Sequence, residues 1–338
     1  MKIAFLYAGQ GSQRVGMGKD FYEEFDSFKN HIDNLKDSDV IKTHMFEGPI
    51  EELSNTKNTQ RAMAAYAGAV TDMLADEGIK PEVSMGLSLG EYGALYSAGV
   101  YDYDAYVALT TFRGEKMSEA AAGKKCAMSA ILGLSSEDVT KACEDYMKEH
   151  TDSAGGANAE TEKKNIEENN NEDIYVTVSN YNCTGQCVIC GTQKAVEEME
   201  GILKEKGAKR CVRVNVSGPF HTKYMKEAGD ALESYFNDKP LNTPSIPVLL
   251  NATGDYYKDG DDLSKQLIKQ VQSSVRLEEN IEKLLDSDID TFIEIGPGKV
   301  VSGFLKRMTK GIDRDVKLLN IDTVEDYKSV VEYVKNNK

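Results

Sequence analysis

The pattern of apolar positions alternates along the chain between short continuous runs and helical spacing. The run at 2–8, "KIAFLYA", predicts a buried strand, and apolar residues at helical spacing predict helices over 20–36, 58–77 and about 102–122. A further short strand precedes the stretch "GLSLGEYGAL" at 86–95, which favours a turn and then a helix. Strands that alternate with helices are typical of an α/β fold with a parallel sheet.

The middle of the chain follows a different order of strand, helix, two strands, helix and strand. These elements are expected at 126–134, about 136–148, 173–181, 186–191, about 192–206 and 210–216. The β-α-β-β-α-β order predicts a small ferredoxin-like domain. The pattern leaves open whether the strand at 210–216 closes this unit or returns to the first sheet. We favour the return, because "SGPFH" follows that strand immediately.

The segment 151–173 reads "TDSAGGANAETEKKNIEENNNED" and contains one large apolar residue. Such a segment cannot bury enough surface to offset its ordering entropy, so we expect a mobile surface loop. After His221 the α/β alternation resumes. Its elements are expected as a helix to about 236, a strand near 246–250, helices across 262–286, a strand at 291–295, the turn "GPG" at 296–298 and a final helix.

The net charge of the chain is −16, which argues against a nucleic-acid binder, because phosphate contacts need a basic surface. No apolar run approaches the roughly 18 residues of a membrane span, and the apolar run after Lys2 is too short for a signal peptide. We therefore expect a soluble, cytoplasmic protein with reduced thiols, and a monomer.

Three of the cysteines have a spacing that could indicate a cluster-binding loop. Cys183, Cys187 and Cys190 form C-x3-C-x2-C, similar to enzymes that bind an iron–sulfur cluster and S-adenosylmethionine. The stretch "CVICG" alternates like a strand, however, and a strand would send Cys187 and Cys190 to opposite faces. We favour buried thiols and expect no metal and no cofactor.

Gly86, Ser88 and Gly90 match G-x-S-x-G, the nucleophile elbow, with a strand before the motif and a helix after it. The glycines allow a tight turn that holds the serine oxygen above the sheet. The helix N-terminus offers N–H groups to developing negative charge. A serine that only caps a helix is the structural alternative.

A serine nucleophile needs a base, and the chain has four histidines. Only His221 follows a predicted strand directly, in the turn "SGPFHT". Ordinary α/β-hydrolases place their histidine near the chain end, after an acid, whereas here a long segment follows His221. This departure indicates another family.

Six stretches in order identify that family. They are "YAGQGSQRVGMG", "GLSLGEYGAL", "TTFRGEKM", "NYNCTGQCVICG", "SGPFHTKYM" and "EIGPGKVVSGFLKR". Together, over about 3–310, they resemble the malonyl-CoA:acyl-carrier-protein transacylases. The resemblance implies an α/β-hydrolase-like domain, here 1–124 and 210–338, with an inserted ferredoxin-like domain at 125–209.

The resemblance also implies roles for individual residues. Ser88 would be the nucleophile and His221 its base, and the backbone N–H groups of Gln10 and Leu89 would form the oxyanion hole. Arg113 would bind the malonyl carboxylate.

Two further positions follow from the same resemblance. The segment around Gln270, in "IKQVQSSVR", would supply the acceptor that orients the histidine, and Gln60, in "NTQRAM", would lie near the pocket. Two residues depart from the family pattern. Leu87 stands where histidine usually precedes the nucleophile, and Ala8 stands where proline usually precedes "GQGSQ".

Alternative interpretations of these motifs stay open. The loop "GQGSQ" could bind a nucleotide, although it lacks a phosphate-loop lysine and G-x-G-x-x-G fails at Arg14. Arg113 on a helix is by default a solvated charge, but its guanidinium fork suits bidentate binding of a carboxylate. We interpret "GPG" at 296–298 as a structural turn.

The activity implied is ping-pong transfer of malonyl from malonyl-CoA, through a malonyl ester of Ser88, to the phosphopantetheine thiol of acyl carrier protein for fatty-acid synthesis. The rival functions are an acyltransferase of polyketide synthesis, a serine esterase or thioesterase, and a catalytically silent docking protein. Acidic carrier proteins need a basic patch, which we expect on one helical face. Its residues would be Lys299, Lys306, Lys310 and the neighbouring Arg307.

Overall fold

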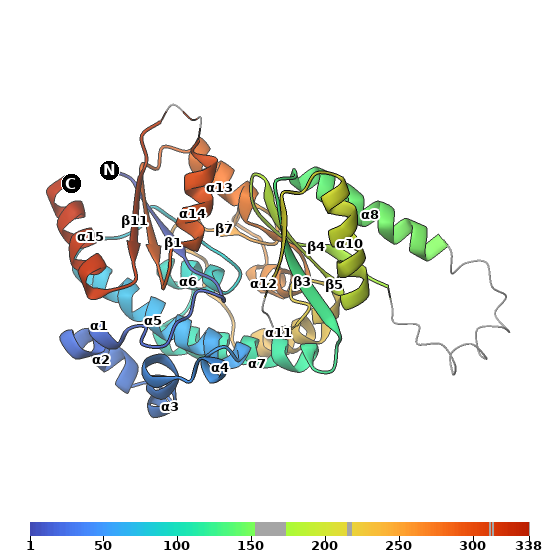
Figure 1. Ribbon diagram of the computed structural model, residues 1–338. Coiled ribbons are helices and arrows are strands. Elements are labelled where there is room, and N and C mark those ends of the chain that lie inside the picture. Colours follow the sequence, from blue (N-terminus) through green and yellow to red (C-terminus); the bar gives the residue numbers. More distant parts are fainter. Residues whose placement is uncertain (153–173, 215–217, 311, 313, 338) are drawn as a thin grey trace.

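The computed structural model is built around two β-sheets that lie side by side (Figure 1). It describes residues 1–152, 174–214, 218–310, 312 and 314–337. The mobile loop predicted at 151–173 therefore lies, from residue 153 onward, outside the described residues.

The first sheet is parallel and has the strand order β11-β10-β1-β2. Its strands are β1 (Ile3–Tyr7), β2 (Val83–Gly86), β10 (Thr291–Ile295) and β11 (Lys317–Ile321). β1 and β10 are fully buried, as expected for the centre of a parallel sheet. Because Tyr7 pairs with both Gly86 and Ile295, the carboxyl ends of three strands meet at one edge. The α/β class predicted from the sequence is confirmed.

One set of helices packs around this sheet, and some of these helices also lie beside the second sheet. They are α1 (Lys19–Glu24), α2 (Asp26–Asp33), α3 (Ser38–Lys42), η1 (Thr43–Glu47), α4 (Ile50–Leu53), α5 (Thr56–Asp76), α6 (Leu89–Ser97), α7 (Tyr103–Ala121), η2 (Lys223–Met225), α11 (Lys226–Asp238), α12 (Leu263–Gln272), α13 (Leu277–Asp286), α14 (Val300–Met308) and α15 (Val324–Asn337). The long helices expected over 58–77 and 102–122 are α5 and α7. The strand β11 and the helix α15, which follow α14, were not predicted.

The helix predicted over 20–36 is two helices, α1 and α2. The chain breaks at Phe25, whose backbone is extended with φ −117° and ψ 114°. The break brings Phe21 and Phe28 together in the core, with ring centroids 5.3 Å apart. Aromatic packing therefore overrides the continuous helical spacing of the sequence.

The second sheet has the order β6-β3-β5-β4-β9. Its strands are β3 (Cys126–Leu132), β4 (Val176–Cys183), β5 (Gln186–Thr192), β6 (Arg210–Arg213) and β9 (Val275–Arg276). The helices α8 (Ser136–Asp152) and α10 (Gln193–Glu205) cover its outer face, away from the first sheet (Figure 1). Antiparallel pairing of β4 with β5 confirms the predicted hairpin.

The predicted return of 210–216 to the first sheet is wrong. β6 pairs antiparallel with β3, from Ser129 beside Arg213 to Leu132 beside Arg210. Three of its four side chains are exposed, so β6 is an edge strand. The charges of "RCVR" suit that position, whereas a strand inside the parallel sheet would be apolar throughout.

The two sheets share parts of the chain and a core. β9, which comes after His221, pairs in parallel with β4, and a lone bridge joins Ser84 to Val248 beside β2. The two-stranded sheet of β7 (Leu249–Leu250) and β8 (Asp255–Tyr256) follows that bridge. The inner face of the second sheet packs into the main core cluster, and its outer face forms a separate cluster with α8 and α10.

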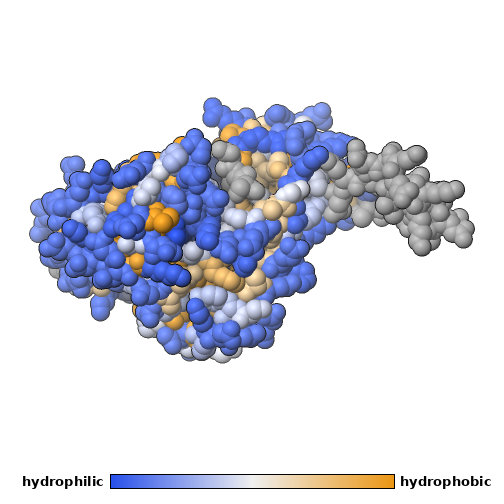
Figure 2. Space-filling model, turned by 90° about the horizontal axis from the view of Figure 1, so that it is seen from below, coloured by the Kyte–Doolittle hydropathy of each residue, from blue (hydrophilic) through white to orange (hydrophobic). Residues whose placement is uncertain are grey.

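The face of the molecule seen in Figure 2 is mainly hydrophilic. Figure 2 views the molecule from below Figure 1 and shows hydrophobic residues gathered chiefly in the middle of this face. Across the part of the chain that the structure describes, no helix combines the length and apolar character needed to cross a bilayer.

Candidate active site

Ser88 lies in the tight turn between β2 and α6, at the carboxyl edge of the first sheet. Its backbone is left-handed, with φ 53° and ψ −98°, which is rare for a residue with a side chain. A Cβ on Gly86 would lie 2.0 Å from the carbonyl carbon of Gly90, and one on Gly90 would lie 2.1 Å from the oxygen of Tyr7. The close approach of β2 to the start of α6 therefore demands Gly86, and packing of the turn against β1 demands Gly90.

His221 faces Ser88 from the turn that precedes η2. Its Nε2 lies 2.7 Å from Ser88 Oγ, and its Nδ1 lies 2.8 Å from the backbone oxygen of Gln270. Because a carbonyl oxygen only accepts, Nδ1 carries the proton and Nε2 is free to accept from the serine hydroxyl. Burial, and then the nearby Arg113, lower the pKa of His221 to about 4. The ring is therefore neutral at neutral pH.

Gln270, on α12, contacts both members of the pair. Besides its carbonyl at His221, its side-chain Nε2 donates to the backbone oxygen of Ser88 over 2.8 Å. Its Oε1 accepts from Arg113 over 2.9 Å. Gln270 is fully buried and so fixes the serine turn, the histidine ring and the arginine relative to one another.

Arg113, on α7, is a buried cation that points at the serine. It is 1% exposed, and its guanidinium lies 5.0 Å from the Tyr92 ring centroid. It donates to Gln60 Oε1 over 2.8 Å and to Ser88 Oγ over 3.1 Å. Among the described residues no salt bridge joins it to a carboxylate, and Nε has no hydrogen-bond partner. Burial lowers its pKa.

A cavity of about 270 Å³ opens over Ser88 and lies between the two sheets. Its wall includes Gln10, Gln60 and His221 on one side and residues of β3, β4 and β5 on the other. Leu89 is the first residue of α6, and Gln10 follows β1. Neither of their backbone N–H groups has an acceptor within the described chain, which leaves both able to donate to a ligand.

Of the two departures from the family pattern, one lines this cavity and the other packs on the turn before α14. Leu87 lines it, and its backbone N–H donates to the oxygen of Tyr7 over 3.1 Å. Ala8 packs on the turn at 296–298, where a Cβ on Gly296 would lie 2.7 Å from the Ala8 Cβ. Gly296 and Gly298 have φ 136° and 79°, consistent with a structural turn.

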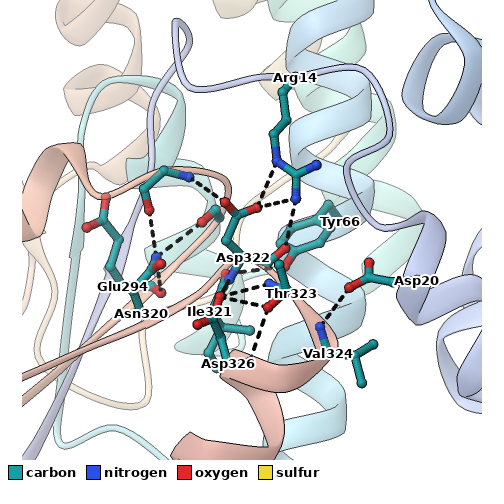
Figure 3. A network of polar contacts seen from close by, with 12 residues as sticks. Arg14, Asp20, Tyr66, Glu294, Asn320, Ile321, Asp322, Thr323, Val324 and Asp326 are labelled. Carbon is teal, nitrogen blue, oxygen red and sulfur yellow. Dashed lines mark hydrogen bonds and ion pairs between the residues drawn. The ribbon is translucent and has the colours of Figure 1, made fainter.

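The loop after β1 is held by a polar network at the end of β11 (Figure 3). Arg14 donates to Asp322 Oδ1 through Nε over 3.2 Å and through Nη2 over 2.8 Å. The other carboxylate oxygen accepts from Gly298 N over 3.2 Å. Asp322 therefore ties the loop that carries Gln10 to the turn that leads into α14.

The four predicted docking residues lie along α14 and just beyond its ends. Lys299 is the N-cap of the helix, Lys306 and Arg307 lie in its last turn, and Lys310 lies beyond its end. All four are exposed. Arg307 donates to Gln186 of β5, which lines the cavity, over 2.9 Å, so Arg307 lies at the cavity rim.

Two residues at the serine turn were missed by the sequence analysis. Asn251, after β7, contacts the backbone on both sides of Leu87, and Glu91 of α6 accepts from Asn251 N over 2.6 Å. Both are fully buried. Glu91 lies within the motif "GLSLGEY", and a carboxylate inside an otherwise apolar segment was the available signal. Asn251 carries no comparable signal.

The cysteine spacing does not bring three thiols together. Cys187 packs in the outer cluster beside α8 and α10, whereas Cys190 packs in the main core, so the two face opposite sides of β5 as predicted. Burial raises the pKa of Cys183 to about 11 and that of Cys187 to about 12. Within the described part of the chain, no group of three or more His, Cys, Asp or Glu residues is placed to hold a metal ion.

This site combines a serine on a strained turn, a neutral histidine and a buried arginine, and comparison with known proteins identifies its family. The model of the acyl transferase domain matches residues 4–147 and 130–337. A malonyl CoA-acyl carrier protein transacylase of Bacillus subtilis is 37% identical over 336 residues, covering 99% of this chain and 98% of the relative.

Solved structures agree with this relationship. A malonyl CoA-acyl carrier protein transacylase from Clostridium perfringens has a TM-score of 0.85 at 33% identity, covering 99% of this chain and 98% of the other. A malonyl-transacylase in complex with its type II PKS acyl-carrier protein has a TM-score of 0.85 at 29% identity, covering 98% and 100%. The chain belongs to the acyltransferase family and is an enzyme of that class. The resemblance to malonyl-CoA:acyl-carrier-protein transacylases predicted from the sequence is confirmed.

Proposed function

We propose that this acyltransferase moves a malonyl group from malonyl-CoA to the phosphopantetheine thiol of an acyl carrier protein, through a malonyl ester of Ser88. The observation that carries the proposal is Arg113. A buried guanidinium without a carboxylate partner costs desolvation energy, and it lies within hydrogen-bond distance of the nucleophile. A substrate carboxylate would supply the missing partner in bidentate geometry.

The first half-reaction begins when His221 Nε2 takes the proton of Ser88 and the serine oxygen attacks the thioester carbonyl carbon. The N–H groups of Gln10 and Leu89 stabilise the oxyanion of the tetrahedral intermediate, where one such donor typically contributes on the order of 10²–10³ in rate. Collapse of the intermediate breaks the carbon–sulfur bond. The proton on His221 passes to the leaving sulfur, and coenzyme A departs.

The second half-reaction reverses these steps with another thiol. His221 accepts the proton of the phosphopantetheine thiol, whose sulfur attacks the ester carbonyl of Ser88. The serine oxygen leaves and takes the proton back from His221. The Gln270 carbonyl keeps the imidazole in the required tautomer in both halves, the role that a carboxylate has in a Ser-His-Asp triad.

The carrier protein would reach the cavity over α14, where Lys299, Lys306, Arg307 and Lys310 offer local positive charge on a protein of net charge −16. The solved complex of a structural relative contains a type II PKS acyl-carrier protein, and the curated relatives are named for acyl carrier protein. We infer fatty-acid synthesis as the process supplied. No added cofactor is needed for this chemistry. A cytoplasmic monomer stays a prediction.

We also infer that the second sheet is a ferredoxin-like insert in an α/β-hydrolase-like domain. Its elements run β3-α8-β4-β5-α10-β6, with the antiparallel strand order β6-β3-β5-β4. Since β6 belongs to this sheet, the insert would extend from Cys126 to Arg213 rather than ending at 209.

An assay with malonyl-CoA and purified holo carrier protein tests the function. We expect carrier-dependent malonylation of the carrier thiol, and intact-mass detection of one malonyl group on the enzyme when the carrier is omitted. Rapid release of free malonate regardless of carrier would instead identify a hydrolase. The same assay with carriers of fatty-acid and polyketide systems separates the two pathways by their kcat/KM.

A further inference from the structure

Asn251 uses its side-chain amide to bridge the serine turn. Its Oδ1 accepts from the backbone N–H of Ser88 over 2.7 Å, and its Nδ2 donates to the backbone oxygen of Gly86 over 2.9 Å. The two contacted peptide groups flank Leu87. The amide therefore satisfies, with one donor and one acceptor, both backbone groups that the sharp turn leaves outside the regular sheet and helix.

Glu91 in turn holds Asn251 in place. Its Oε2 accepts from the Asn251 backbone N–H over 2.6 Å, while the Asn251 backbone oxygen accepts from Arg276 N over 2.9 Å. Glu91 and Asn251 are both fully buried. The second carboxylate oxygen, Oε1, has no hydrogen-bond partner in the described part of the chain. Burying a carboxylate costs free energy, so we expect Glu91 to make a contribution that offsets this cost.

That contribution is to support the unusual backbone conformation of Ser88. A left-handed backbone at a residue with a side chain persists only where its surroundings over-determine it. Here Asn251 holds the Ser88 N–H, and Gln270 holds the Ser88 carbonyl oxygen. These two bonds fix the peptide planes on either side of the serine, and thus the direction of its Oγ toward His221. The second of these planes, which Gln270 holds through the Ser88 carbonyl oxygen, also carries the Leu89 N–H and so sets its direction.

We propose that Asn251 and Glu91 are positioning residues, which hold the Ser88 turn so that Oγ meets His221 and the Leu89 N–H points into the cavity. The proposal rests on the proposed function only in taking Ser88 as the nucleophile. Because Asn251 already occupies the Ser88 N–H, that group is withdrawn from oxyanion stabilisation. This leaves the donor role to Leu89 and Gln10.

A role in folding alone predicts a different result from a role in positioning. Pre-steady-state release of coenzyme A on mixing with malonyl-CoA separates the two, because the burst amplitude counts competent sites and the burst rate constant reports acylation at each of them. Misplacing a reacting atom by about 1 Å can cost on the order of 10² in rate. We therefore expect Asn251→Ala to lower the burst rate constant by about that factor, with KM changed less than threefold.

Asn280 provides the matched control. It is also a fully buried asparagine, on α13, and its side-chain atoms have no partner in the described chain. Asn280→Ala should keep the wild-type burst rate constant. If Asn251→Ala lowers only the amplitude and leaves the rate constant at the wild-type value, Asn251 is merely structural and the proposal fails.

Asn251→Asp gives a second readout, in case the alanine variant does not fold. The aspartate keeps the acceptor for Ser88 N–H but places an oxygen against the Gly86 carbonyl, where only a protonated acid can donate. Burial favours that protonated form, so the variant-to-wild-type ratio of burst rate constants should rise about tenfold from pH 8 to pH 5.5. Tyr92, Arg113 and His221, which also face this site, are common to both proteins, so the ratio cancels their titration. Burial raises the pKa of Glu91 to about 7, but its carboxyl group keeps an acceptor oxygen for the residue 251 N–H in either protonation state. A flat ratio would contradict the bridging role.

Glu91→Gln keeps an oxygen acceptor, whereas Glu91→Ala removes it. The glutamine variant should recover most of an expected loss of about tenfold in the alanine variant, which is the scale of one buried hydrogen bond. Equal rate constants in the two variants would remove Glu91 from the proposal. Wild-type enzyme that gives no burst would instead disprove the proposed function itself, and that outcome needs no Asn251 variant.

Discussion

The two sides of the cavity are built in different ways. On the Ser88 side, the reacting groups are buried, and backbone groups or buried amides fix each of them within 2.7–2.9 Å. On the α14 side, the basic residues are exposed, and within the described chain only Arg307 of the four hydrogen-bonds to a residue of the cavity wall. A buried contact network tolerates no displacement, whereas exposed charges act at a distance and are screened by salt.

This difference sets the size of effect that a substitution should have on each side. Loss of a group on the Ser88 side removes transition-state stabilisation outright. Loss of a charge on the α14 side changes the rate of encounter with the carrier protein. The predictions below test this contrast from its strongest point to its weakest.

Ser88→Ala should abolish both half-reactions, with a loss of at least about 10⁴ in kcat, because no other group can form the acyl-enzyme. Intact-mass analysis after mixing with malonyl-CoA should show one malonyl group on the wild type and none on the variant. Labelling of the variant to the wild-type level would disprove the nucleophile assignment.

Arg113→Ala should lose two charge-assisted hydrogen bonds to the malonyl carboxylate, each about 1.5–3 kcal/mol. Malonyl transfer should then fall by on the order of 10²–10⁴, since each 1.4 kcal/mol is about tenfold. Acetyl-CoA has no carboxylate, so its transfer should fall much less.

The decisive quantity for Arg113 is the malonyl-to-acetyl ratio of kcat/KM, because Arg113 also touches Ser88 Oγ and a general loss would affect both substrates. Arg113→Lys should restore only part of the ratio, since an ammonium cannot reproduce the guanidinium fork. An unchanged ratio in Arg113→Ala would make Arg113 structural.

Charge reversal at Lys306 and Arg307 should raise the KM for carrier protein several-fold, about 1 kcal/mol, and leave the KM for malonyl-CoA unchanged. Reversal of Lys328 and Lys335, exposed residues on α15, changes the net charge equally and serves as the control. The effect should shrink in high salt. An equal rise for both substrates would remove α14 from the docking surface.

The pH dependence of acylation should be nearly flat above pH 5.5. Burial holds the pKa of His221 near 4, so the base remains neutral well below the ordinary histidine pKa of 6.5. The burst rate constant should change less than twofold between pH 7.5 and 5.5, whereas an unshifted histidine would lose about tenfold. A half-maximal rate near pH 6.5 would show that His221 is accessible to water during the reaction.

The sequence was informative where the backbone itself dictates the residue. Gly86 and Gly90 could be placed because the turn admits no Cβ at either position, and the surrounding strand and helix follow from periodicity. The fold class and the hairpin of β4 and β5 were predictable for the same reason. The residues to which the family resemblance assigned catalytic roles lie close together around Ser88.

Other features depend on contacts that no local pattern records. A lone asparagine after a short strand gives no hint that its amide will bridge the turn near Ser88, more than 150 residues earlier in the chain. The break at Phe25 depends on which aromatic rings it brings together, and the pairing of β6 depends on which sheet edge is free. In each case tertiary packing overrides local preference.

The position of β1 has a consequence for how the protein is made. β1 precedes the other strands of its sheet along the chain, yet one of its two neighbours is β10, so that Ile3 pairs with Thr291. The second sheet differs, because β3, β4, β5 and β6 all lie within 126–213 and can pair as soon as that segment leaves the ribosome. Contacts this distant in sequence form late. The apolar edge of β1 therefore stays unpaired until residues 291–295 have been translated. During that time it can aggregate or bind chaperones. The turns that carry Gln10 and Ser88 gain their final support only then.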